Sequence, residues 1–346
     1  MKLGFLLGAG GAQYTLNMDL VRLVEDLGYD SIWTSEAWGA DAISPAAWVL
    51  AKTTKIKVGT GIIQMPARTP SLAAMTAMTL QQLSGGRFIL GIGPSGPQVI
   101  EGWHGVAYGR PLTRTREYIS IIRQILAREN PLQHDGFHYH IPNHGEGTTG
   151  LGKPLKSVLH NDGPLRIVTG TISPAGVRMS AEVADGMIPV FMNPDRFDIF
   201  DQPMQEGFAK AGGGKGLDDY AVTPFCTCNL ADDIEAARAP VKRNLALYIG
   251  GMGARDSNFY NDYAKRLGFE DAAVEIQDHF LAGRRAQAVD AVPDELVDAV
   301  SLVGPKERIV ERLKAWKAAA AKRHVDSILI AAQQPEALKL LAETVL

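Results

Sequence analysis

Short apolar runs alternate with amphipathic segments along this chain, and the alternation constrains the fold more strongly than any other feature. Eight runs have the length and composition of buried strands: Lys2–Leu6, Ser31–Thr34, Lys57–Ile63, Phe88–Gly91, Arg166–Thr169, Met187–Val190, Ala221–Cys226 and Asp326–Ala331. Continuous apolar strands that alternate with helices are typical of a parallel sheet covered by helices. The pattern therefore predicts the α/β class and, most simply, a closed (β/α)8 TIM barrel with insertions.

The segments between these runs carry helix signals. Asn17 is placed to cap a helix that Gly28 ends, because asparagine favours helix starts and glycine favours helix ends. A second helix is indicated by the apolar stripe Tyr118, Ile121, Ile122 and Ile125, whose spacing puts all four side chains on one face.

Two stretches depart from the alternation of strands and helices. Residues 131–163 are rich in Gly, His and Pro and are too long for an ordinary connection, so we expect a lid or a hairpin excursion there. Residues 250–299 look helical but are additional to the eight units. Since no linker separates two cores, residues 1–346 are expected to form one domain with these two insertions.

The composition limits the kinds of partner that the protein is expected to bind. The 35 Lys and Arg residues against 38 Asp and Glu residues give a net charge of −3, so no overall field would recruit nucleic acid or an anionic membrane. No apolar stretch reaches the ~18–20 residues that span a bilayer. Cys226 and Cys228 are the only two cysteines, which fits a reducing cytoplasm. A small-molecule substrate is the expected partner.

The active site of such a barrel lies at the carboxyl ends of its strands. The residues that follow the strands are mostly polar, rich in glycine and poor in acid–base groups: Gly8–Gly11, Gln13, Ser35, Glu36, Trp38, Gln64, Arg68, Gly93–Gln98, Gly170–Gly176, Asn193 and Gln333. This composition favours a cradle for a planar cofactor over a hydrolytic triad.

The run Gly91–Gly96 matches G-x-G-x-x-G, which in a Rossmann fold binds a dinucleotide. That function needs a helix that begins at the third glycine, yet Gly102 and Gly105 break the following segment within two turns. The motif therefore favours a backbone cradle along a different flat cofactor, formed by Gly93, Ser95, Gly96 and Gln98.

The fifth strand is followed by a helix start that suits a phosphate. Ser173 precedes Pro174, and proline at a first helical position leaves free amides and a favourable dipole behind it. We expect the phosphate of a cofactor at Gly170, Thr171, Ile172, Ser173 and Gly176. The alternative is an ordinary Ser-Pro helix cap.

Four of the eight histidines lie in the excursion: His134, His138, His140 and His144. No Asp or Glu constellation joins them in sequence, so a surface or lid role is expected and no metal site.

Several stretches resemble a known family: Ser31–Gly39, Val58–Gln64, Leu83–Phe88 with Gly91–Glu101, and Ala184–Gly186. Over essentially its whole length the chain is similar to the bacterial luciferase-like flavin and deazaflavin oxidoreductases. Within that family, Ser95–Trp103 resembles the subgroup that uses coenzyme F420, a deazaflavin. The resemblance implies a TIM barrel, usually a homodimer, with the cofactor ring at the strand ends and its phosphate at the fifth-loop helix.

The resemblance also implies site residues. A cis peptide bond supports the middle of the ring in relatives, and here it corresponds to Gly61–Ile62, with Ser35 and Gln64 as further cofactor-binding residues. Relatives that oxidise sugar phosphates carry a proton-accepting histidine where this chain has Ala37. Glu36 and His104 remain as the candidate proton carriers, although Glu36 could instead hydrogen-bond a neighbouring loop.

The function implied by the resemblance is hydride transfer between coenzyme F420 and an organic small molecule. An FMN-dependent luciferase-like monooxygenase is the alternative, and a non-enzymatic flavin-binding protein is the second alternative. The excursion is expected to close over the cofactor, with Lys153 and Lys156 meeting its anionic tail, unless it is a solvated loop whose lysines have no partner.

Overall fold

The computed structural model describes residues 1–8, 12–161 and 163–346 and confirms the TIM barrel. Its wall consists of β1 (Lys2–Leu6), β2 (Ser31–Thr34), β3 (Lys57–Thr60) with β4 (Ile63–Gln64), β5 (Phe88–Gly93), β8 (Ile167–Gly170), β9 (Gly186–Ile188), β10 (Ala221–Val222) with β11 (Phe225–Leu230), and β13 (Ser327–Ala331). β10 pairs with β9, and β11 pairs with β13, which also pairs with β1. Because β10 and β11 are halves of one segment, the parallel sheet closes on itself.

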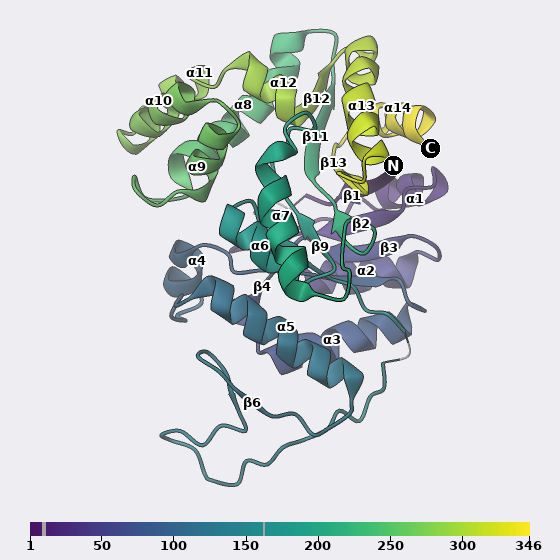
Figure 1. The fold of residues 1–346 in the computed structure, drawn as a ribbon. Helices are drawn as coiled ribbons and strands as arrows, with labels where there is room; N and C mark the ends of the chain where they lie inside the picture. Colours follow the sequence, from purple (N-terminus) through teal and green to yellow (C-terminus); the bar gives the residue numbers. More distant parts are fainter. Residues whose placement is uncertain (9–11, 162) are drawn as a thin grey trace.

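Helices surround the strands (Figure 1). They are α1 (Met18–Asp26), α2 (Ile43–Lys52), α3 (Pro70–Leu83), α4 (Pro97–Gly102), α5 (Pro111–Ala127), α6 (Pro174–Val183), α7 (Asp198–Ala211), α13 (Lys306–Ala321) and α14 (Pro335–Val345), with a 3-10 turn at Met65–Ala67. The Asn17 side chain accepts a hydrogen bond from the Leu20 amide, and Gly28 has a φ of +84° after α1, so both predicted signals are confirmed. The predicted apolar stripe of α5 is buried.

The third strand contains a bulge. Gly59 pairs with Ile89 and Ile63 pairs with Ile92, so four steps along β3–β4 oppose three steps along β5. The extra residue falls where the Gly61–Ile62 peptide bond is cis, as the resemblance implied. The Thr60 hydroxyl donates to the Gly91 carbonyl (2.7 Å) and accepts from the Gly91 amide (2.9 Å), so a side chain replaces the missing strand pairing.

The barrel interior is filled around Trp33. Its indole packs with one side chain from each of four other strands: Ile89, Val168, Ile188 and Leu329. A Cβ at Gly59 would lie 2.5 Å from the Trp33 ring, so the neighbouring strand has room for the indole only because residue 59 is glycine. The interior is therefore a packed core, which confines any ligand to the rim.

Beyond the eight predicted strands there is a further one, β12 (Ser301–Gly304), which pairs with the Thr227–Leu230 half of β11. This run was not among the eight predicted strands, although it is as long as Ser31–Thr34. Residues 250–299 are largely helical, as expected: α9 (Phe259–Arg266), α10 (Glu270–Leu281), α11 (Arg285–Asp290) and α12 (Asp294–Val300) follow α8 (Ile234–Gly251). These helices gather at the upper left of Figure 1.

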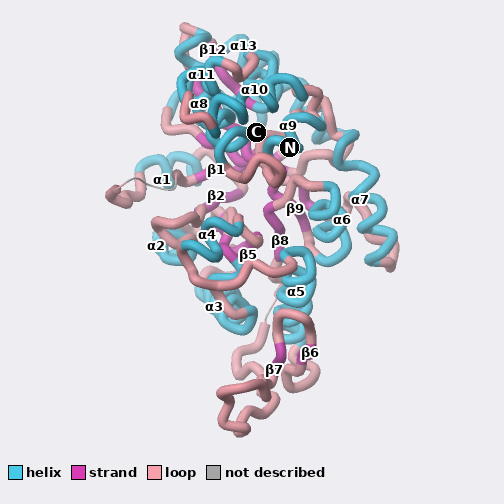
Figure 2. The backbone as a smooth tube through the Cα atoms, turned by 90° about the vertical axis from the view of Figure 1, so that its left-hand side faces the viewer, coloured by secondary structure: helices cyan, strands magenta, loops and turns pink. Residues whose placement is uncertain are grey.

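The excursion contains a hairpin, and its role as a lid over the cofactor stays a prediction. Its hairpin, β6 (His134–Asp135) and β7 (His140–Ile141), lies against α5, and the rest of the excursion projects away from the barrel (Figure 2). The Glu117 carboxylate on α5 accepts hydrogen bonds from the amides of Phe137, His138 and Tyr139, at 2.8, 2.9 and 3.1 Å. A buried carboxylate thus fixes the hairpin to the outside of α5.

Lys156 and two of the histidines in the excursion have local contacts. Lys156 donates to the carbonyl of Glu129, just before the excursion (3.0 Å), and the contact of Lys153 and Lys156 with a cofactor tail stays a prediction. His138 contacts Arg114, whereas His140 contacts Asp135. The two histidines therefore have separate partners. Among the described residues, no helix is long and apolar enough to cross a membrane.

We predict that Gly91→Ala destabilises the protein by about 3 kcal/mol, because a Cβ at this position would lie 1.7 Å from the Thr60 carbonyl oxygen, a backbone atom of the bulge. The free energy of unfolding in urea measures the effect. Gly216→Ala is the matched control, since its Cβ would meet nothing within 4 Å, and it should change stability by less than about 0.5 kcal/mol. Equal effects of the two substitutions would contradict the packing of the bulge.

A second prediction concerns Glu117. Burial raises the pKa of this carboxyl, but the amides of His138, Phe137 and Tyr139 outweigh that effect, so the pKa lies below its ordinary 4.5. Because the folded pKa is lowered, docking of the hairpin is fully stabilised above pH 4.5 and weakens as the pH falls through the folded pKa. Glu117→Gln should therefore speed amide exchange in residues 132–142 by roughly tenfold or more at pH 7.

Hydrogen exchange detected by mass spectrometry, corrected for intrinsic rates, measures this change. Glu129→Gln is the control, because the Glu129 side chain is exposed and only its carbonyl is used. Acidification to about pH 4 should speed exchange in the wild type more than in Glu117→Gln. A hairpin that exchanges equally in all three proteins would show that Glu117 does not hold it.

Candidate active site

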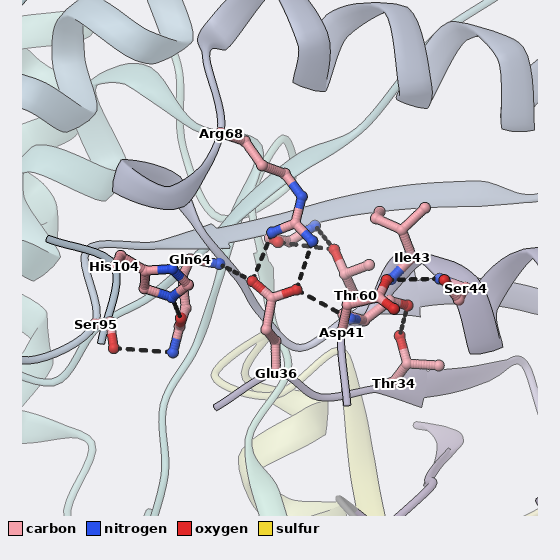
Figure 3. Close-up of polar contacts among 12 residues, drawn as sticks. Thr34, Glu36, Asp41, Ile43, Ser44, Thr60, Gln64, Arg68, Ser95 and His104 are labelled. Atoms are coloured by element: carbon pink, nitrogen blue, oxygen red, sulfur yellow. Dashed lines mark hydrogen bonds and ion pairs between the residues drawn. The ribbon is translucent and has the colours of Figure 1, made fainter. Parts of the chain in front are cut away.

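Polar side chains from three successive strand ends meet at the rim of the barrel (Figure 3). Glu36 follows β2, Gln64 ends β4, and Ser95 follows β5. His104, which lies just beyond α4, joins them. The structure thus brings together four of the residues that the sequence nominated, including both candidate proton carriers.

Every oxygen of Glu36 is occupied by donors. Arg68 binds it through two hydrogen bonds, at 2.6 and 2.7 Å, and the amides of Gln64 and Ala42 donate at 2.9 and 3.0 Å. The Glu36 side chain is only 6% exposed, so the charge is paired and buried. These contacts match the alternative in which Glu36 hydrogen-bonds a neighbouring loop. The role of Glu36 as a proton carrier stays a prediction. To accept a proton, the carboxylate would first have to lose one of these four hydrogen-bond donors.

Arg68 was nominated from the sequence by its place after the third strand, but no role was assigned to it. Burial lowers the pKa of its guanidinium, but the hydrogen bonds and charge of Glu36 outweigh this, and the pKa is raised overall. Arg68 is therefore a cation at neutral pH. The structure adds its role, which is to pair with the Glu36 carboxylate.

Gln64 connects the ion pair to His104. Its side-chain oxygen lies 2.7 Å from His104 Nε2, and its amide nitrogen donates to the Ser95 hydroxyl at 3.2 Å. Ser95 is itself held, because the Tyr108 hydroxyl donates to its carbonyl at 2.9 Å. Tyr108 was not anticipated from the sequence, and no motif marks it.

An apolar floor lies beside this polar network. Ile62, directly after the cis bond, packs against two glycines on neighbouring strands. A Cβ at Gly93 would lie 2.3 Å from Ile62 Cδ1, and one at Gly170 would lie 3.3 Å from Ile62 Cγ2. Ile62 therefore packs over Gly93 and Gly170, and side chains at these two glycine positions would obstruct it.

The fifth loop ends in the predicted helix start. The Ser173 hydroxyl accepts from the Gly176 amide at 3.1 Å and so caps α6. A Cβ at Gly176 would lie 2.0 Å from the Thr171 hydroxyl, which brings both hydroxyls of the loop to the helix start. Ile172 is buried, and its carbonyl accepts from Arg266 of α9 at 2.9 Å. Arg266, like Tyr108, was not anticipated from the sequence.

The remaining nominated residues flank these groups. Gly96 precedes α4, which ends after six residues at Gly102, as the argument against a Rossmann site expected. Gln98 is exposed on that helix, whereas Ser35 is half-buried beside Glu36. Of the predicted glycine loop after β1, residues 9–11 lie outside the described residues.

Two cavities were found elsewhere. One, of about 480 Å³, is lined by residues at the amino ends of β8 and β9, including Arg166 and Asp185. The other, of about 640 Å³, lies between β12 and α13 beside Arg312. Neither cavity is lined by the residues nominated for the site, which lie at the strand ends of the barrel rim.

Comparisons with known proteins agree with this arrangement. Residues 2–323 match the luciferase-like monooxygenase family. The chain is 43% identical to a Mycobacterium tuberculosis protein named "Putative coenzyme F420-dependent oxidoreductase", over 100% of this chain and 99% of the relative. It is 26% identical to the 5,10-methylenetetrahydromethanopterin reductase of Archaeoglobus fulgidus, over 94% and 93% of the two chains.

A solved structure shares the fold. The coenzyme F420-dependent tetrahydromethanopterin reductase from Methanopyrus kandleri superposes with a TM-score of 0.75 at 21% identity, covering 99% of this chain and 98% of that one. At this identity the likeness supports the fold alone.

We predict that the Glu36–Arg68 pair is strongly coupled. Arg68→Met should cost about 3–5 kcal/mol of unfolding free energy, because it leaves a buried carboxylate without its cation. Adding Glu36→Gln should recover part of that loss, since the double variant buries no charge. Urea unfolding of the two single variants and the double variant gives the coupling energy, and losses that add within about 0.5 kcal/mol would show that the pair is not coupled.

Proposed function

Because the chain belongs to the luciferase-like monooxygenase family, we propose that it is an oxidoreductase that transfers a hydride between coenzyme F420 and an organic small molecule. The 43%-identical relative, which matches over the full chain, supports the choice of a deazaflavin over FMN. The alternative functions are an FMN-dependent monooxygenase and a flavin-binding protein without activity.

The observation that carries this proposal is the apolar floor at the strand ends. A flat ring system needs a surface without protruding side chains, and the floor has glycine at two positions where even a Cβ would collide with Ile62 or contact it closely. Gly61 and Ile62 would support the ring from below, with Gly93 and Gly170 beside it. Ser35, Gly96 and Gln98 are proposed to border it.

The phosphate of the cofactor would lie at the start of α6. The helix dipole favours an anion there, and the hydroxyls of Thr171 and Ser173 add donors beside the Gly176 amide, which Ser173 caps. The Arg266 guanidinium, bound to the Ile172 carbonyl, contributes positive charge to the same loop. These residues therefore suit a phosphorylated cofactor.

The bound deazaflavin would supply obligate two-electron chemistry with little reactivity toward oxygen. The protein then needs to orient the two reactants, exclude water and move one proton. Glu36 is saturated with donors, whereas His104 keeps one ring nitrogen without a partner among the described residues. We therefore assign the proton to His104 rather than to Glu36.

Three further statements stay predictions from the sequence: that residues 1–346 form one domain, that the protein is a homodimer, and that it is cytoplasmic. The buried free thiols of Cys226 and Cys228 agree with a reducing compartment. Burial raises the pKa of the Cys228 thiol to about 12, so it is not a nucleophile at neutral pH.

Equilibrium binding and turnover test the function. We expect coenzyme F420 to bind at least roughly tenfold more tightly than FMN, a difference of about 1.4 kcal/mol, and to be reduced or oxidised anaerobically with a member of a substrate panel. Tight FMN binding with oxygen consumption would contradict the proposal in favour of a monooxygenase. Binding without turnover on any substrate would favour a flavin-binding protein. The chromophore retained from the native host provides an independent check.

A further inference from the structure

We propose that Gln64 is a positioning residue that holds His104 in the form protonated at Nε2, so that Nδ1 is the atom that takes or returns the proton of the reaction. The inference rests on the proposed function, because it names the proton carrier of that same hydride transfer. It assigns to Gln64 a task other than the cofactor contact expected from its sequence position.

The first step concerns the hydrogen-bonding capacity of the two side chains. The oxygen of a glutamine amide can only accept, and it lies 2.7 Å from His104 Nε2. The hydrogen between them must therefore belong to Nε2. A neutral imidazole carries one ring hydrogen, so Nδ1 keeps a lone pair. Among the described residues nothing hydrogen-bonds Nδ1.

The second step concerns what orients the amide. Gln64 is only 2% exposed, and its amide nitrogen donates to the Ser95 hydroxyl at 3.2 Å. Ser95 sits at a φ of +57°, and its carbonyl is held by the Tyr108 hydroxyl. The fourth loop thus holds the hydroxyl that accepts from the amide nitrogen, and in this arrangement the amide oxygen faces His104 (Figure 3).

The third step concerns the backbone of Gln64. Its amide donates to Glu36, which two hydrogen bonds tie to Arg68. Because Gln64 is anchored at the backbone by one loop and at the side chain by another, it has few ways to relax. This rigidity distinguishes it from a surface glutamine that touches a histidine by chance, and it is the property required of a residue that selects a tautomer.

The proton balance follows. Oxidation of a substrate removes a hydride, which carries both electrons of the broken C–H bond to the deazaflavin, and leaves one proton on the substrate. The lone pair of Nδ1 forms the new N–H bond, and the imidazolium that results keeps its Nε2–H bond to Gln64. In the opposite direction Nδ1 gives the proton back. The excess proton then passes to solvent, since His104 is only half-buried.

The test reads the tautomer directly. In protein labelled with 15N at histidine and held at about pH 8.5 without cofactor, long-range 1H–15N correlation spectra should show His104 Nδ1 as an unprotonated, pyridine-type nitrogen; His104→Asn identifies the signal. Gln64→Met, which has similar volume and only a weakly accepting thioether, should shift the signals toward a mixture of tautomers. Gln64→Glu keeps an acceptor and should restore the Nε2–H form.

Kinetics complete the test. Gln64→Met should lower kcat with coenzyme F420 by about tenfold while KM stays within about twofold, because the His104 ring loses its fixed orientation as well as part of the competent tautomer, and Gln64→Glu should recover most of the loss. Gln124→Met, an exposed glutamine of α5, is the matched control and should change neither the tautomer nor kcat. Urea unfolding confirms that each variant is folded.

The outcomes are separable. A protonated Nδ1 in the wild type, or a tautomer that Gln64→Met leaves unchanged, would overturn the inference whatever the cofactor is. If the wild type shows the expected tautomer, Gln64→Met shifts it, and kcat of that variant is nevertheless unchanged, the proton role of Nδ1 is overturned. A wild type with the expected tautomer and no F420-linked turnover on any substrate would overturn the proposed function, and the proton role with it, while the tautomer assignment would stand.

Discussion

The site depends on one buried carboxylate. Glu36 takes four donors, from the Ala42 amide, the Gln64 amide and the Arg68 guanidinium, and a buried charge is tolerated only when its lone pairs are satisfied in this way. Because these donors come from the loops that follow the second and third strands, their hydrogen bonds to Glu36 hold the two loops at a fixed distance. The Gln64 side chain then continues the chain of hydrogen bonds to Ser95 and His104, so the fourth loop is held as well.

Packing of apolar side chains determines the apolar floor of the site. The Trp33 indole fills the barrel over Gly59, and the bulge that follows in the same strand brings Ile62 to the rim against Gly93 and Gly170. The apolar floor is therefore a consequence of steric fit, while the polar wall beside it is a consequence of charge. The two meet in the segment from Gly61 to Gln64, which carries the backbone of the floor and the amide that binds Glu36.

A second buried carboxylate explains why the hairpin of the excursion lies against α5. Glu117 captures three successive amides of the hairpin, as Glu36 captures two amides and a guanidinium. A carboxylate that accepts several N–H groups gains more than a solvated one, so the hairpin stays on the flank of α5. Composition indicated an excursion at 131–163, but nothing in its glycines and histidines identified Glu117 as the partner.

The sequence by itself determined the eight strands and the helix starts, because these depend on apolar periodicity and on hydrogen bonds within three or four residues. Asn17 with Leu20 and Ser173 with Gly176 are such local pairs. The cis bond was accessible only through resemblance to a family. The tertiary structure alone decided which groups meet: Glu36 with Gln64 and Arg68 across 28 and 32 residues, and β12 with β11. Residue types indicate which groups need a partner, but only chain closure over tens of residues decides which partner comes within 3 Å.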